Sequence, residues 1–238
     1  MKKKICLLLL LFCSILSFPL VAKAANITVG DSGCNYTNLS EAIDSSGIGD
    51  TITLQSDTTL TALQYITKPI TIDLNNHNIT LTTADGFHVN GGNLSLTGTG
   101  TISGNVGSAT PIRVSGSSNS STSNYSVLNV GPNVTIQSNY CAVALTYRVP
   151  AGNPMSLPYT DNYFYGMVIN FEGIAIGTDF GISVNGTIRN SAANYPIMNI
   201  SGTAKITSSD VPVYAAGYAD WTFASGVTVS RCWLSSSN

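Results

Sequence analysis

Charged side chains are scarce in this chain. Its 238 residues include 10 Lys and Arg and 12 Asp and Glu, or 9%, whereas about a quarter of a typical globular chain is charged. Four of the ten basic residues lie at the N-terminus, and without them the net charge is 6 − 12 = −6. Nucleic-acid binding requires clustered Lys and Arg, so the composition excludes a nucleic-acid partner. It also argues against an acidic polysaccharide as the substrate.

Cysteine is scarce as well. Cys6 and Cys13 fall in the N-terminal apolar run, which leaves Cys34, Cys141 and Cys232. These three form no C-x-x-C pair and have no His at ligand spacing, so we expect no metal site. We predict that all three are buried, unpaired thiols, with one disulfide among them as the alternative.

Only one stretch is apolar enough to resemble a membrane span. Lys2, Lys3 and Lys4 precede the apolar run Ile5–Val21, and Ala22-Lys23-Ala24 has the small-x-small pattern of a signal-peptidase site. We therefore predict a signal peptide over residues 1–24, one domain over residues 25–238, and a secreted or cell-surface location. A retained anchor is the alternative, and after cleavage we expect no membrane span.

Short β-branched runs bounded by Gly, Asn or Asp recur along the rest of the chain and predict an all-β protein. Clear examples are Thr51–Leu54, Ile70–Leu74 and Ile197–Ile200. Helical periodicity occurs once, at Asn38–Asp44, where Leu39, Ala42 and Ile43 share one face. We expect this short helix to cap the first strands.

A degenerate repeat favours a solenoid over a sandwich. Two apolar-x-apolar units flank a Gly-containing turn in Val89–Leu96, Val130–Ile136, Ile200–Ile206 and Phe223–Val229. Periods of 20 to 50 residues are typical of solenoids, and about 20 to 25 residues per turn would give eight or nine turns.

Asparagines follow or lie within these strands and predict a structural ladder of stacked amides. Asn is also frequent in any turn, which is the alternative explanation. The six residues of the predicted ladder are Asn75, Asn90, Asn129, Asn170, Asn185 and Asn199.

Two stretches carry a resemblance to a known family. Cys34–Asp44 followed by Gly49–Leu54 resembles the opening of right-handed parallel β-helix proteins of the pectin-lyase-like group. Ile70–His77 and Val89–Leu94 are similar to repeats of exported, adhesin-like bacterial surface proteins. The resemblance implies a single-stranded right-handed parallel β-helix at the cell surface, and it specifies a fold more than a chemistry.

Two segments interrupt the strand pattern and predict long loops. Residues 115–126 are of low complexity, and residues 147–165 are rich in Pro and aromatic residues. Aromatic rings suit stacking on sugars, so the second loop is the candidate ligand site. Packing of the rings onto the solenoid is the alternative. The candidate ligand-binding residues are Tyr147, Tyr159, Tyr163, Phe164 and Tyr165.

The sequence offers no catalytic motif of the family's enzymes, so no catalytic residue is predicted. Asp50 and Asp73 are 23 residues apart and would stack as an acid–base pair, but each lies beside a turn, where Asp caps backbone groups. His77 and His88 lie half a turn apart, so we expect them on different faces.

We therefore expect a non-catalytic, adhesin-like or carbohydrate-binding protein without a cofactor, whose partner is a glycan or another host or cell-surface ligand. One alternative is a polysaccharide lyase or glycoside hydrolase of the pectin-lyase-like group, for which a lyase would bring calcium. The other is a structural fragment of a larger surface protein.

Overall fold

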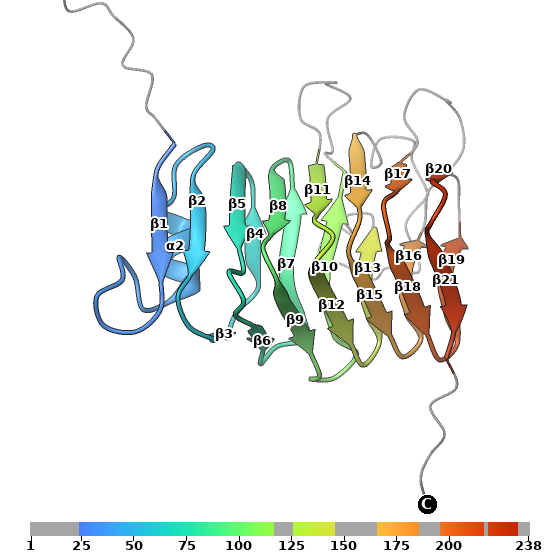
Figure 1. The fold of residues 1–238 in the computed structure, drawn as a ribbon, viewed down its shortest axis with the longest axis horizontal. Coiled ribbons are helices and arrows are strands. Elements are labelled where there is room, and N and C mark those ends of the chain that lie inside the picture. The colour runs from blue at the N-terminus through green and yellow to red at the C-terminus, as the bar shows by residue number, and fades with distance from the viewer. Residues whose placement is uncertain (1–23, 117–125, 146–165, 186–195, 217–218, 233–238) are drawn as a thin grey trace, which may run out of the picture.

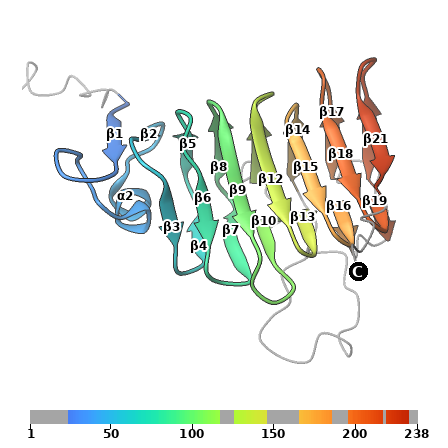
Figure 2. The same ribbon diagram turned by 60° about the horizontal axis from the view of Figure 1, so that its bottom comes forward.

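The protein is a parallel β-helix. The computed structural model describes residues 24–116, 126–145, 166–185, 196–216 and 219–232. Three parallel sheets run the length of the coil, and each turn contributes one strand to each sheet in succession. Figures 1 and 2 show the turns stacked side by side along one axis. The predicted fold class is confirmed.

The bounds of the elements follow the order of the sheets. The eight-stranded sheet consists of β1 (Asn26–Val29), β2 (Thr51–Leu54), β5 (Pro69–Asp73), β8 (Asn93–Thr97), β11 (Ser126–Val130), β14 (Met167–Phe171), β17 (Ile197–Ile200) and β20 (Asp220–Phe223). The seven-stranded sheet consists of β3 (Thr58–Leu60), β6 (Ile79–Leu81), β9 (Gly100–Gly104), β12 (Val134–Ser138), β15 (Ile174–Gly177), β18 (Lys205–Ser208) and β21 (Thr228–Arg231). The six-stranded sheet consists of β4 (Gln64–Ile66), β7 (Asp85–Asn90), β10 (Thr110–Ser115), β13 (Cys141–Leu145), β16 (Phe180–Asn185) and β19 (Val211–Ala216).

The core is a stack of apolar side chains inside the coil. Alternation along each strand sends every second residue inward, and the register places like residues above one another. Ile102, Ile136, Ala175 and Ile206 form one such inward column, and all four are fully buried. No single turn could bury its apolar face alone, so the turns stabilise one another by stacking.

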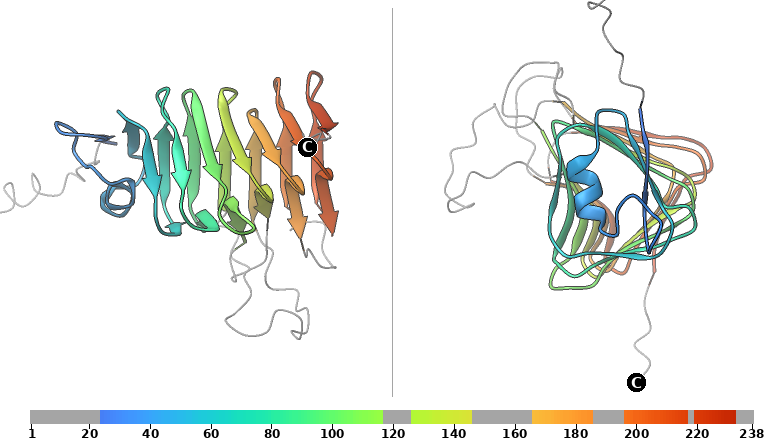
Figure 3. Two further views of the ribbon diagram at one scale, coloured as in Figure 1. Left: turned by 90° about the horizontal axis from the view of Figure 1, so that it is seen from below. Right: turned by 90° about the vertical axis from the view of Figure 1, so that its left-hand side faces the viewer.

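Helix α2 (Leu39–Ser45) covers the N-terminal end of the core, one residue shifted from its predicted range. Asn38 is the N-cap, and its side-chain oxygen accepts from the backbone N of Ser40 at 2.8 Å. Leu39, Ala42 and Ile43 are buried against the first turns, as predicted. Figure 3 shows the helix lying across the opening of the coil.

The predicted repeat mixes two different corners of the coil. Gly131, Gly202 and Gly226 lie where the chain passes from the eight-stranded to the seven-stranded sheet, whereas Gly91 lies at the corner between β7 and β8. The unit Val89–Leu96 is therefore out of phase with the other three, because similar Gly-containing turns serve both corners.

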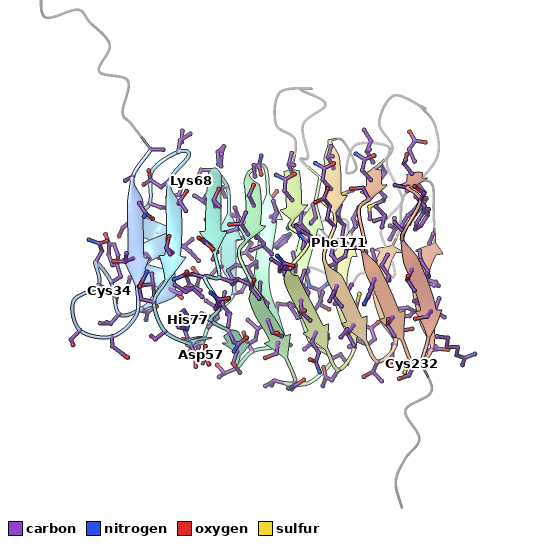
Figure 4. All side chains as sticks on the ribbon, in the orientation of Figure 1. Cys34, Asp57, Lys68, His77, Phe171 and Cys232 are labelled. Atoms are coloured by element: carbon purple, nitrogen blue, oxygen red, sulfur yellow. The ribbon has the colours of Figure 1, made fainter. Side chains whose placement is uncertain are left out.

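The cysteines differ from the prediction in their burial. All three stand as free thiols, but only Cys141 is buried, while Cys34 is half-buried and Cys232 is exposed. Figure 4 places Cys34 near the helix-capped end and Cys232 near the opposite end. Cys34 and Cys232 lie in connecting segments outside the strands, which explains why neither reaches the core.

Candidate functional site

The outer face of the six-stranded sheet carries a row of mostly polar and aromatic side chains. The register aligns one outward residue from each strand across the sheet. This row consists of Tyr65, His88, Arg113, Ala144, Ser183 and Tyr214. Its first half is accessible, because Tyr65 is 58% exposed, whereas Ala144 and Ser183 in the second half are buried.

Strand alternation fixes the outward direction of His88 and Arg113. Phe87 and Val89 on either side of His88 are fully buried in the core. Successive side chains point to opposite faces of a strand, so the ring of His88 projects outward. Ile112 and Val114 are buried in the same way and direct Arg113 outward beside His88.

An acidic residue at the start of β7 contacts Arg113 on the same face. Gly86 is buried, and a Cβ there would lie 2.6 Å from the carbonyl oxygen of Pro111, so only glycine fits at this approach. The preceding residue, Asp85, accepts at its Oδ1 from Arg113 Nε at 2.7 Å. The two side chains are 35% and 29% exposed, so this ion pair is partly solvated.

His88 has two contacts on this face. Its Nε2 lies 2.8 Å from the hydroxyl oxygen of Ser115 at the end of β10. Its ring lies beside the ring of Tyr65, with the centroids 5.3 Å apart and the planes tilted by 34°. One turn of the coil thus presents a flat aromatic ring, and the next two present groups that donate and accept hydrogen bonds. We refer to Tyr65, Asp85, His88, Arg113 and Ser115 as the Tyr65 cluster.

Thr110 and Cys141 lie deeper on the same sheet. Thr110 is in register with Asp85, and its hydroxyl oxygen is buried without a hydrogen-bond partner among the described residues. Cys141 is buried, and this burial raises the pKa of its thiol to about 12. A thiol with such a pKa is protonated at neutral pH and is a poor nucleophile.

The long connections of the coil leave from one corner, next to the Tyr65 cluster. The segments between β10 and β11, between β13 and β14, and between β16 and β17 each join the six-stranded to the eight-stranded sheet. Ser115, the last residue of β10, lies at this corner, and the hydroxyl of Ser126 at the start of β11 donates to its carbonyl oxygen at 2.5 Å. Both residues belong to strands, so the loop predicted over 115–126 is shorter than expected.

The predicted ligand-binding residues Tyr147, Tyr159, Tyr163, Phe164 and Tyr165 lie outside the described residues. Their segment starts just after β13 and ends just before β14, at the corner beside the Tyr65 cluster.

Three of the six predicted ladder residues form a hydrogen-bonded column on the eight-stranded sheet. Asn129, Asn170 and Asn199 are in register on β11, β14 and β17. Asn170 Nδ2 donates to Asn129 Oδ1 at 2.8 Å, and Asn199 Nδ2 donates to Asn170 Oδ1 at 2.9 Å. Asn129 Nδ2 extends the column to Asn93 Oδ1 at 3.0 Å. The column lies on the outer face within the strands and not at a bend.

The other three ladder residues lie elsewhere, so one common phase for all six is wrong. Asn75 occupies a turn with a φ of 46°, and its Nδ2 donates to the carbonyl oxygen of Leu54 at 2.9 Å. Asn90 and Asn185 end strands of the six-stranded sheet. Asn is common both in turns and in outward strand positions, so its spacing alone does not separate the two.

Asp50 and Asp73 do not stack, because Asp73 is in register with Thr53. Asp50 Oδ1 accepts from Ala25 N at 2.7 Å and Oδ2 accepts from Gly47 N at 2.6 Å. These backbone hydrogen bonds hold the pKa of Asp50 below its usual value. Asp73 Oδ1 accepts from Asn75 N at 3.0 Å. Both carboxylates cap turns.

His77 lies in the turn before β6 and not on the face of His88, as the half-turn spacing predicts. Its Nδ1 lies 3.6 Å from Asp57 Oδ1, and Figure 4 shows the two residues together at one corner of the coil. Asp57 also accepts from Asn78 N at 2.8 Å, which lowers the pKa of Asp57. This pair holds successive turns together.

A separate hollow of about 380 Å³ lies on the seven-stranded sheet. Its lining includes Ile174, Ile176, Lys205, Thr207 and Cys232. It contains none of the residues of the Tyr65 cluster. Ser208 at one end has a buried hydroxyl oxygen without a described partner.

Within the described ranges, no group of three or more His, Cys, Asp or Glu side chains is placed to hold a metal ion. In the same ranges no helix is both long and apolar enough to cross a bilayer.

Comparisons of the chain with models of protein families, with curated proteins and with solved structures find no match.

The Tyr65 cluster was not predicted as a site from the sequence. A signal for it exists, because Phe87-His-Val89 and Ile112-Arg-Val114 share an apolar-polar-apolar pattern 25 residues apart. Pro111 argues against a strand at the second of these sites, since proline is rare inside a sheet.

Proposed function

We propose that the protein is an exported, non-catalytic glycan-binding protein of the adhesin-like type, and that the Tyr65 cluster forms part of its binding face. The observation that carries the proposal is the exposed Tyr65 ring beside hydrogen-bonding side chains on neighbouring turns. Sugar rings combine apolar faces with many hydroxyl groups. A flat aromatic face next to fixed donors and acceptors suits both features.

The rigidity of the coil supports this proposal. His88 and Arg113 lie on strands that pair on both sides, so binding a sugar requires little ordering of the backbone. The ion pair of Asp85 with Arg113 leaves the face without a strong net charge. A neutral or weakly charged glycan fits this face better than a polyuronate does.

The segment between β13 and β14 contains the aromatic residues that the sequence predicts to bind a ligand. The aromatic segment 147–165 is joined to the coil at the corner beside Ser115. Its Tyr and Phe residues would add further stacking surfaces, as the sequence predicts. The signal peptide that the sequence predicts over residues 1–24 supports a secreted or cell-surface location for such a protein.

One observation favours a second function, cleavage of a polysaccharide. His88 Nε2 lies 2.8 Å from Ser115 Oγ, and Arg113 is the neighbour of His88 on β10. An imidazole beside an arginine offers groups for proton transfer and charge stabilisation. The pairing of Arg113 with Asp85 opposes this second function, because it satisfies the positive charge.

One experiment separates the candidates. The purified protein is screened on a glycan array and is incubated with polysaccharides with and without calcium. Binding without depolymerisation is the expected result. Depolymerisation would replace the proposal with the lyase or hydrolase function. Neither binding nor cleavage would contradict both and favour a structural role within a larger surface protein.

A further inference from the structure

The C-terminal end of the coil exposes side chains that continue the core. Trp221 and Phe223 of β20 are in register with the buried Met198 and Ile200. Val229 of β21 is in register with the buried Ile206. Phe223 and Val229 are each 46% exposed, although Ile200 and Ile206 directly beneath them are fully buried. Trp221 and Phe223 lie with nearly parallel rings, 5.7 Å apart and 3° between planes. We call Trp221, Phe223 and Val229 the end plate.

The backbone at this end also offers unpaired edges. β19, β20 and β21 are the last strands of their sheets, and no described strand pairs with their outer edges. Proteins usually block such edges with Lys, Pro or a bulge. The edge strands contain no Lys and one proline, Pro212 in β19. Pro212 has the same position in the six-stranded sheet as Pro111 of β10, because the residues that follow them, Val213 and Ile112, lie in one register column. Because β10 pairs on both sides despite Pro111, Pro212 does not prevent pairing.

The opposite end of the coil is closed. Helix α2 covers the core there with Leu39, Ala42 and Ile43. Lys68 Nζ donates to the backbone oxygens of Asp44 and Ser46 at the end of the helix, which fixes the helix to the coil. The N-terminal end therefore offers no exposed core against which the C-terminal end of another molecule can pack. A head-to-tail filament would have to displace the helix.

We infer that two copies of this chain associate through their C-terminal ends, end plate against end plate. The twofold axis of this dimer lies in the interface, perpendicular to the coil axis. The strands of the partner therefore run around the coil in the opposite direction. Each edge strand then meets an antiparallel strand of the partner, and antiparallel pairing satisfies the free backbone groups. The two end plates meet inside the joined coils, so one core runs through both molecules. An interface of this kind is isologous and closes at two copies.

The stability of this dimer is tested with two matched variants. Val229 and Val106 are both 46% exposed, but Val106 lies between β9 and β10, away from the end. The mass of the purified protein in solution is measured by light scattering for the wild type, Val229→Lys and Val106→Lys. The expected masses are two chains for the wild type and Val106→Lys, and one chain for Val229→Lys. The affinity of the dimer should weaken at least a hundredfold in Val229→Lys, since a lysine buried at the interface is left unpaired.

Hydrogen exchange locates the interface independently of any variant. The amides of β20 and β21 should gain protection as the protein concentration rises through the dimerisation range. A wild type that stays monomeric at high concentration would overturn the inference, as would open-ended growth into larger assemblies. A dimer whose β20 and β21 amides exchange as fast as in the monomer would overturn it too, because its contact would lie on another face.

Discussion

Asn170 Nδ2 donates a 2.8 Å hydrogen bond to Oδ1 of Asn129, the residue in the same register one turn earlier in the coil. The bond joins two turns through side chains, in addition to the backbone pairing of the sheet. Asn199 repeats the contact on the next turn, so the middle residue has a partner on each side.

Replacing the middle residue should therefore have a larger effect than replacing an isolated surface asparagine. Asn170→Ala removes two side-chain hydrogen bonds from a half-buried site, and we expect a loss of about 1–2 kcal/mol in the free energy of unfolding. Urea denaturation measures the loss. The matched control is Asn105→Ala, at an exposed position of the turn after β9, with an expected change within about 0.5 kcal/mol. Equal effects of the two variants on the free energy of unfolding would show that the asparagine column does not stabilise the protein.

The inward isoleucine column should dominate stability. Ile136 is fully buried between Ile102 and Ala175. Ile136→Ala should lower the free energy of unfolding by about 2–5 kcal/mol, because it removes buried methylenes and leaves a cavity. Ile48→Ala, at a residue that is 76% exposed, should change it little in the same denaturation experiment. A small effect at Ile136 would mean that the turns do not share one continuous core.

The architecture follows from the sequence where the strand pattern is regular. Thr51–Leu54 and Ile197–Ile200 match their predicted bounds, and Ile70–Leu74 is shifted by one residue, because each alternates inward apolar with outward residues. β13 departs from this pattern. All its residues are buried, so its sequence lacks the alternation of a strand with one solvent-exposed face. The sequence therefore did not predict this strand.

The Tyr65 cluster was harder to predict because it depends on register between turns. The chain between Tyr65 and His88 spans 23 residues and that between His88 and Arg113 spans 25, so no fixed period aligns them. The contact of Asp85 with Arg113 likewise joins residues 28 positions apart in the chain. Asp50 and Asp73 show the converse: their spacing of 23 residues is close to one turn, yet they are out of register, and both cap turns as the sequence favours.

Acid should weaken the start of the coil through Asp50. Its backbone hydrogen bonds lower its pKa in the folded state, so its stabilising contribution is complete above the unfolded pKa of about 3.9. That contribution is lost as the pH falls through the lower, folded-state pKa. Asp50→Asn should flatten the dependence of stability on pH below about 4, measured by denaturation at several pH values. Asp31→Asn, at an exposed carboxylate in the preceding loop, should leave the pH dependence intact.

The three thiols should differ in reactivity toward iodoacetamide. Cys141 is buried, and its pKa is raised to about 12, so at pH 8 it should remain unlabelled in the folded, dilute protein. Exposed Cys232 should react fastest and half-buried Cys34 more slowly. Peptide mapping by mass spectrometry gives the order, and unfolding in urea should make all three equivalent. Fast labelling of Cys141 in the folded protein would contradict its position in the sheet.

The glycan-binding proposal is tested most directly by titrating the strongest array ligand into the wild type, Tyr65→Ala and Ile48→Ala in a calorimeter. Tyr65→Ala should weaken binding at least tenfold, about 1.4 kcal/mol, because the sugar loses its stacking surface. Ile48→Ala removes an even more exposed apolar side chain that does not belong to the Tyr65 cluster, and this variant should bind like the wild type. Unchanged affinity in Tyr65→Ala, with the fold intact by circular dichroism, would contradict the assignment of the Tyr65 cluster as the binding face.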